Sequence, residues 1–121
     1  MTDAGLHQRF DRSQRLQKRS SYLFVQQRGR RVPGQTLVVY AMWRRDGNTK
    51  RASRLGITVS KKVGNAVVRN RVKRWVREGY RRLACAPDAD IVVIAKPTAA
   101  QSSYQATSHE LRNLIDRAQA R

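Results

Sequence analysis

The chain has 121 residues and sets 26 lysines and arginines against only 8 acidic residues, which gives a formal net charge of +18. This length accommodates one domain and leaves no room for a second, while a hydrophobic content of 40% supports one core and excludes a wholly disordered chain. The charge repels itself in a compact fold, so it implies a polyanionic partner, above all nucleic acid.

The residue pattern excludes further classes of protein. No apolar run approaches the ~18–20 residues that cross a bilayer, and the first residues lack the apolar stretch of a signal peptide. Cys85 is the only cysteine, so no internal disulfide can form and a structural zinc site would lack its sulfur ligands. We therefore expect a soluble, cytoplasmic protein with no membrane partner.

The N-terminal residues predict a flexible basic arm followed by a short helix or strand. Residues 1–15 are polar and carry charges of both signs, which is typical of a mobile arm. Ser20 or Ser21 can cap a helix that ends at Gly29, although Leu23-Phe24-Val25 fits the start of a strand equally well. The Arg-Arg-Val-Pro-Gly segment that follows predicts a turn or a sheet edge.

Two strands and a tight turn are predicted in the middle of the chain. Gln35–Trp43 alternates along its length and is apolar on both faces, as in a strand covered on one side and partly on the other. The faces hold Leu37, Val39 and Ala41 on one side, and Thr36, Val38, Tyr40 and Met42 on the other. Asp46-Gly47 is a strong turn signal, and Leu55–Ser60 follows as a second strand. The sequence therefore predicts an antiparallel hairpin of these two strands.

The second half of the chain predicts a helix, a strand and a last helix. Gly64-Asn65 opens a helix to about Leu83 whose apolar stripe holds Val72, Trp75, Val76, Gly79, Tyr80 and Leu83. Ile91–Ala95 is a short apolar run typical of a buried strand, and a final helix begins near Ser102 or Ser103. The inner face of that helix is predicted to hold Tyr104, Thr107, Leu111, Leu114, Ile115 and Ala118. This order of elements predicts one α/β or α+β sandwich domain over residues 16–121.

The predicted helix after Asn65 carries almost one sign of charge. Residues 51–82 hold eleven lysines and arginines and one acid, Glu78. At about 100° per residue, the line opposite the apolar stripe holds Asn70, Arg74, Arg77 and Arg81, flanked by Arg71 and Lys73. A solvated face usually mixes signs, because opposite charges at i,i+4 stabilise a helix by ~0.2–0.5 kcal/mol and like charges cost as much. The pattern favours an anion-binding face over a merely solvated one.

The residues before this helix extend the basic surface. Lys61 and Lys62 are followed by Val63-Gly64-Asn65, so two cations and flexible backbone precede the N–H groups of a helix N-terminus. Such an arrangement can bind a phosphate group, although alone it is weak evidence for a phosphate site. Beside the arginine face it predicts one continuous basic surface.

The segment from Arg54 to Arg82, RLGITVSKKVGNAVVRNRVKRWVREGYRR, resembles the signature of the bacterial ribonuclease P protein subunit. Its centre is the run Arg69-Asn70-Arg71-Val72-Lys73-Arg74, preceded by Ser60-Lys61-Lys62-Val63-Gly64-Asn65-Ala66. The resemblance continues more loosely over residues 16–118, with matching positions at Tyr22, Gly29, Tyr40 and Lys96-Pro97.

The resemblance implies a fold and a function. The family has an α/β sandwich similar to a ribosomal-protein domain, with a mixed sheet and a long basic helix in a left-handed crossover between parallel strands. Its partners are a large catalytic RNA and precursor tRNA, whose 5′ leader the complex removes to produce the mature tRNA 5′ end. The Mg²⁺ ions of the reaction are expected mainly on the RNA and the substrate, and no protein partner is implied.

The resemblance also assigns residues to this function. By match to the motif, the RNA-contacting role falls on Arg69, Asn70, Arg71, Lys73, Arg74 and Arg77, with Lys61 and Lys62 adjacent. Asn65 at the start of the helix and Arg81 on its basic line complete the predicted RNA-binding set. Tyr22 and Tyr40 are the candidates for stacking on the single-stranded leader in a central cleft. Gln26 departs from the family, which often has a second aromatic residue there.

No catalytic residue is predicted in the chain itself. Phosphodiester hydrolysis needs clustered carboxylates for metal ions, or a general base beside an acid, whereas the acids here are scattered. The closest pair, Asp88 and Asp90, is predicted to belong to a turn, and His7 and His109 to the surface. We therefore expect the non-catalytic subunit of a ribonucleoprotein endoribonuclease. The alternatives are a structural RNA-binding protein, such as a ribosomal protein, and a self-contained nuclease.

Overall fold

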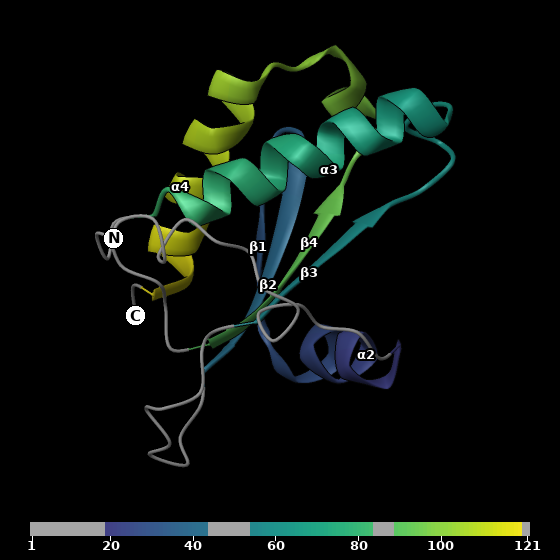
Figure 1. Cartoon of the computed structure of the whole chain (residues 1–121). Coiled ribbons are helices and arrows are strands. Elements are labelled where there is room, and N and C mark those ends of the chain that lie inside the picture. The colour runs from purple at the N-terminus through teal and green to yellow at the C-terminus, as the bar shows by residue number, and fades with distance from the viewer. Residues whose placement is uncertain (1–18, 44–53, 84–88, 120–121) are drawn as a thin grey trace, which may run out of the picture.

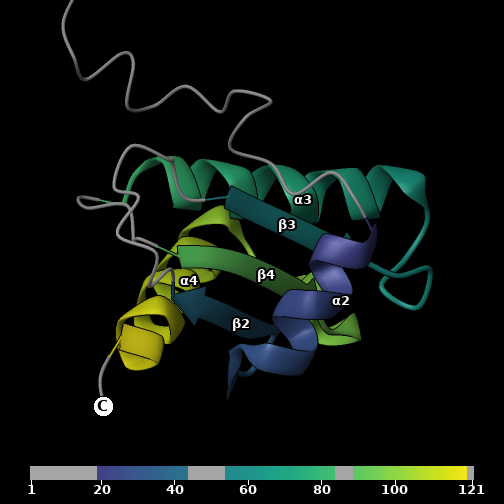
Figure 2. The same cartoon turned by 90° about the horizontal axis from the view of Figure 1, so that it is seen from below.

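The computed structural model describes residues 19–43, 54–83 and 89–119, and their strands form one mixed sheet in the order β1-β2-β4-β3. The strands are β1 (Arg30–Pro33), β2 (Leu37–Trp43), β3 (Arg54–Val59) and β4 (Ala89–Ala95). The helices are α2 (Arg19–Arg28), α3 (Ala66–Arg81) and α4 (Tyr104–Gln119), with the 3₁₀ helix η2 (Pro97–Gln101) before α4. Helices α3 and α4 cover one face of the sheet and α2 lies on the other (Figures 1 and 2). The predicted α/β sandwich with a mixed sheet is confirmed.

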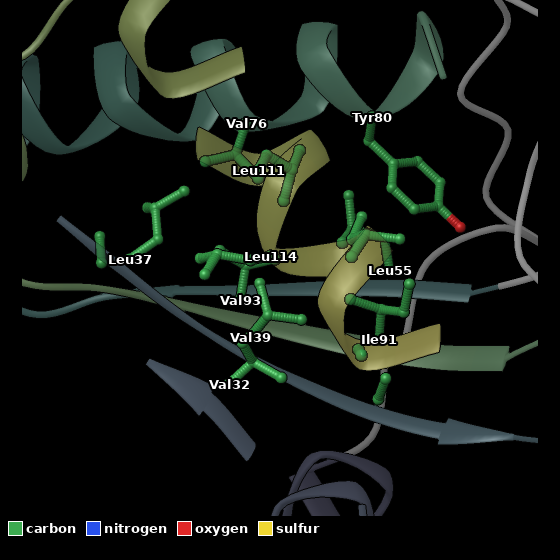
Figure 3. Close-up of a cluster of buried hydrophobic side chains, with 14 of the residues drawn as sticks. Val32, Leu37, Val39, Leu55, Val76, Tyr80, Ile91, Val93, Leu111 and Leu114 are labelled. Carbon is green, nitrogen blue, oxygen red and sulfur yellow. The ribbon is translucent and has the colours of Figure 1, made fainter. Parts of the chain in front are cut away.

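Strand β2 is apolar on both faces because each face packs against a different layer. Leu37 and Val39 belong to the main core under α3 and α4 (Figure 3). Tyr40 and Met42 pack on the other face against a small cluster centred on Val25 of α2. The alternation predicted for this segment is therefore confirmed.

The first described element is a helix rather than a strand. Because α2 already begins at Arg19, Ser20 and Ser21 lie inside the helix, and the prediction that one of them caps it was wrong. The end of the helix was predicted correctly, since α2 stops before Gly29, whose N–H donates to the carbonyl of Val25 at 2.7 Å.

The predicted hairpin of β2 and β3 is wrong, because β4 lies between these two strands. Strand β4 is buried on both faces, so it takes the central place in the sheet. It pairs antiparallel with β2, from Leu37 opposite Ala95 to Trp43 opposite Ala89, and parallel with β3. The antiparallel neighbour of β2 on its other side is β1, which confirms the predicted edge segment.

Helix α3 connects the parallel strands β3 and β4, which confirms the crossover between parallel strands. Arg54 and Asp90, opposite each other where the two strands begin, form a two-pronged ion pair: Nε to Oδ1 is 3.1 Å and Nη2 to Oδ2 is 2.7 Å. This hydrogen bond raises the pKa of Arg54. Asp90 is only 4% exposed and lies in β4, so its assignment to a turn was wrong.

Helix α4 closes the main core against the sheet. Its predicted inner face is buried at Thr107, Leu111, Leu114, Ile115 and Ala118, while Tyr104 is half-buried. Figure 3 shows Leu111 beside Val76 of α3. On the same helix, the carboxylate of Glu110 accepts hydrogen bonds from the N–H of Thr36 at 2.9 Å, its hydroxyl at 2.7 Å, and the N–H of Leu37 at 2.8 Å. These bonds tie α4 to the start of β2.

Other predictions fall outside the described residues. They concern the arm over residues 1–15, the turn at Asp46-Gly47, Cys85 and Asp88.

Candidate RNA-binding surface

The apolar stripe of α3 fixes which side of the helix faces away from the sheet. Val72, Val76 and Tyr80 are buried in the main core, as predicted. Gly79 lies against α4, where an added Cβ would come within 3.2 Å of the Cα of Ser108. Glycine at this position lets the two helices pack closely. Asn70, Arg74 and Arg77 are left on the side of α3 away from the core, whereas Arg69 falls on the same helical face as Val72 and Val76.

The basic residues of α3 and its preceding turn form one surface of nearly one sign. We call it the α3 surface, and it consists of Lys61, Lys62, Asn65, Arg69, Asn70, Arg71, Lys73, Arg74, Arg77 and Arg81. Lys61, Lys62, Asn70 and Arg74 are exposed, and Arg77 is half-buried. Arg81 is partly neutralised, since its Nη1 lies 3.1 Å from Oε1 of Glu78 one turn earlier. The remaining cations make the surface suited to bind a polyanion.

Arg69 and Arg71 are held differently from the exposed cations. Both side chains are half-buried, and the Nε of each is buried without a hydrogen-bond partner. The guanidinium of Arg71 lies over the ring of Trp75, 5.5 Å from its centroid. Such a contact restricts the side chain before any ligand arrives, which reduces the entropy that binding must remove.

The turn before α3 is organised by Ser60 and Asn65. The N–H of Lys62 donates to the hydroxyl of Ser60 at 3.3 Å, and the N–H of Val63 donates to its carbonyl at 3.1 Å. The side-chain oxygen of Asn65 accepts the N–H of Val68 at 3.0 Å, so Asn65 is the N-cap of α3. Its side-chain oxygen therefore already accepts one hydrogen bond within the chain, and its amide nitrogen can donate to RNA.

Tyr22 and Tyr40 pack on one cluster at the other face of the sheet. Both are half-buried and pack against the small cluster under α2, which is formed around Val25 and Val92. The ring of Tyr22 lies over Gly56 of β3, where an added Cβ would come within 2.7 Å of Cε1. The structure thus brings the two tyrosines together and separates them from the main-core side of the sheet, which α3 covers (Figure 2).

Two arginine–aromatic contacts, one on α2 and one on α3, were not predicted from the sequence. Arg71 over Trp75 and Arg28 over Phe24 are both arginine–aromatic pairs four residues apart on a helix. That spacing places two side chains on one helix face, so it could have been used to find both pairs.

Three of the four acidic residues in the described segments bond within the fold, and the fourth, Asp116, is exposed on α4. Glu78 pairs with Arg81, Asp90 with Arg54, and Glu110 binds the start of β2. No group of three histidine, cysteine or acidic side chains comes together in these segments. The described residues also include no helix that is long and apolar enough to cross a membrane. The acidic residues of the described segments therefore do not form a magnesium site.

Comparison with known proteins identifies relatives over nearly the whole chain. A family model described as Ribonuclease P matches residues 10–119. The ribonuclease P protein component of Gluconacetobacter diazotrophicus is 40% identical over 114 residues, which cover 92% of this chain and 96% of the relative. That of Alkaliphilus metalliredigens is 39% identical and covers 84% and 89% of the two chains.

Solved structures agree with this result. The Staphylococcus aureus RNase P protein superposes with a TM-score of 0.76 at 31% identity, covering 88% of this chain and 95% of the other. The Thermotoga maritima RNase P protein gives a TM-score of 0.72 at 32% identity, with coverage of 85% and 96%.

Proposed function

The chain belongs to the ribonuclease P protein family, and from this premise we propose that its α3 surface binds the catalytic RNA while Tyr22 and Tyr40 hold the 5′ leader of precursor tRNA. As a member of the family it is the protein component of a ribonucleoprotein endoribonuclease that processes tRNA. Binding both RNAs promotes removal of the leader and so produces the mature tRNA 5′ end. Family membership favours this function over that of a ribosomal protein.

The charge of the α3 surface is the observation that carries the proposal. Exposed Lys61, Lys62 and Arg74 can each neutralise a phosphate and release its counterions. Arg69 and Arg71 are half-buried, and Arg71 is restricted by its contact with Trp75. Each planar guanidinium can donate two parallel hydrogen bonds to phosphate oxygens. A long RNA with many phosphates matches a surface that runs from a turn along a whole helix.

The leader role rests on the two tyrosines under α2. Tyr22 and Tyr40 each keep part of the ring exposed while the rest packs on the small cluster. Aromatic rings stack on any base, so such a site binds a single strand without sequence specificity. Gln26, half-buried on the same helix, can add a hydrogen bond but no further stack.

The chemistry of cleavage belongs to the RNA in this proposal. Among the described acids, Glu78, Asp90 and Glu110 bond within the fold and Asp116 is exposed on α4, and no three such donors come together. We therefore assign the Mg²⁺ ions, which would activate water and stabilise the leaving oxygen, to the RNA and the substrate. The protein contributes positive charge where two RNAs approach each other. It therefore lowers the magnesium concentration at which the complex forms.

Reconstitution with the cognate catalytic RNA tests this function. At low magnesium, precursor tRNA should be cleaved with protein and RNA together, and scarcely with either alone. At high magnesium the RNA alone should regain much of its activity, because divalent ions replace the protein's charge. Cleavage by the protein without RNA, or no effect of the protein at any magnesium concentration, would contradict the proposal.

A further inference from the structure

The outer face of α2 carries apolar side chains that the fold does not use. Leu23 is 43% exposed and Phe24 is 49% exposed; among the described residues, the other large hydrophobic side chain that is this open is Val67, at 73%. Helix α2 already packs on the sheet through Tyr22 and Val25. Figure 2 looks onto this side of the molecule and shows no described element in front of α2.

Phe24 forms a defined pair with an arginine. The guanidinium of Arg28, one turn later, lies 5.5 Å from the centroid of the Phe24 ring. Both residues are exposed, so the ring and the planar guanidinium are both accessible to a ligand. Unpaired bases stack on aromatic rings and on arginine planes alike.

The charge around this pair indicates what it binds. No acidic residue occurs between Arg19 and Trp43, and Arg28 and Arg31 are exposed at the end of α2 and in β1. Arg30 is engaged elsewhere, since its Nη1 donates to the carbonyl of Ala118 at 3.4 Å. A second copy of this chain would bring like charge to this surface. A nucleic-acid strand brings phosphates for the arginines and bases for the ring.

We propose that Phe24 and Arg28 form a second stacking platform, which binds an unpaired base of the leader farther from the cleavage site than the nucleotides held by Tyr22 and Tyr40. This inference rests on the proposed leader role of the two tyrosines. The side chains of both tyrosines pack on the sheet side of α2, whereas Phe24 is exposed, so a strand that leaves the tyrosines reaches Phe24 by passing around one helix about 10–12 Å in diameter. Leaders too short to pass around the helix do not reach the platform.

The test compares precursors with leaders of about two and about twelve nucleotides, a span that one single-strand-binding domain can cover. The full chain is assembled with its catalytic RNA, and the affinity for each precursor is measured. Phe24→Ala should weaken binding of the long-leader precursor roughly fivefold and leave the short one unchanged. Phe24→Trp should retain the parent affinity for the long-leader precursor. Leu23→Ala, an apolar truncation on the same exposed face without an arginine over it, is the matched control and should change neither.

A fluorescent base identifies the RNA that contacts Phe24. With 2-aminopurine at successive leader positions, one distal position should be quenched in the complex and recover its fluorescence in Phe24→Ala. Equal weakening of both precursors would place Phe24 on the catalytic RNA and overturn the inference, as would a change of oligomeric state in Phe24→Ala.

The inference and the proposed function can fail separately. If Tyr22→Ala and Tyr40→Ala discriminate between the two leader lengths and Phe24→Ala does not, the platform is wrong and the leader role of the tyrosines stands. If none of the three variants discriminates and no leader position is quenched, the leader role itself fails together with the platform.

Discussion

At the scale of single residues, Trp75 acts on RNA binding through Arg71. Its ring packs against the main core on one side and lies under the Arg71 guanidinium on the other. Removing the ring while keeping an apolar side chain frees Arg71 without emptying the core. The arginine then has to be ordered anew when RNA binds, so affinity falls although no direct contact has been deleted.

A double-mutant cycle of Arg71→Ala and Trp75→Leu measures this effect. We expect each single change to weaken binding of the catalytic RNA. The double variant should lose less binding free energy than the two single variants added together, by about 0.5–1 kcal/mol, the size of an exposed cation–π contact. Thermal unfolding of each variant serves as the control for folding. Strictly additive losses in affinity would mean that Trp75 does not position Arg71.

Tyr22 and Tyr40 should discriminate between precursor and mature tRNA. Alanine at either position removes a ring worth on the order of 1–3 kcal/mol of stacking, so the precursor should bind more weakly while mature tRNA, which lacks the leader, is little affected. Phenylalanine at the same positions keeps the ring and should preserve affinity. Equal weakening for both tRNAs would show that the tyrosines serve only the cluster under α2.

At the scale of elements, local patterns predicted helices well and strand partners poorly. The limits and buried stripe of α3 follow from a 3.6-residue period and the cap at Asn65, both of which are properties of one short segment. The neighbours of β4 depend on segments far apart in the chain, so the Asp46-Gly47 signal led to the wrong hairpin. Asp90 was misassigned for the same reason, because its burial depends on the register of β4 against Arg54.

The exposed face of α3 could be predicted for the same reason as its buried apolar stripe, because both follow from the helical period. The positions of Asn70 and Arg74 opposite the core follow from helical periodicity, and the structure leaves both exposed. Which arginines are restricted and which are open was not predictable, because burial of the Nε atoms of Arg69 and Arg71 depends on how the helix packs.

Arg74→Ala tests whether helix α3 binds the phosphates of the RNA. Loss of one phosphate contact should flatten the slope of log affinity against log salt by about 0.7–0.9. Cleavage should fall at low magnesium and recover at high magnesium, where divalent ions screen the phosphates. Stability should change by no more than about 0.5 kcal/mol, since Arg74 is exposed and Arg71 and Arg77 repel it from the neighbouring turns.

Arg112→Ala is the matched control for that experiment. Arg112 is exposed on α4, and its truncation removes the same charge from a site outside the α3 surface. An equal change in the salt slope for both variants would indicate that only the total charge matters. A rate that stays low in Arg74→Ala at high magnesium would indicate a direct role in cleavage.

At the scale of the whole molecule, the charge is not balanced within the fold. The chain has 26 lysines and arginines and only 8 acidic residues, so its acids are too few to balance its cations. A formal charge of +18 on 121 residues therefore disfavours the compact state at low ionic strength. Anions that bind the native surface should offset this cost.

The melting temperature should accordingly rise more in sulfate or phosphate than in chloride at equal ionic strength, because a ligand that binds only the native state stabilises it by mass action. Sulfate also stabilises proteins by exclusion from their surface, and that effect acts on all variants alike. The difference between the parent chain and the double variant Lys61→Ala/Lys62→Ala isolates the bound anion, since these exposed lysines flank the N-terminus of α3. We expect the variant to lose part of the gain in sulfate and none of the gain in chloride. If both chains gain equally in every salt, the stabilisation is simple screening and the turn before α3 holds no defined anion.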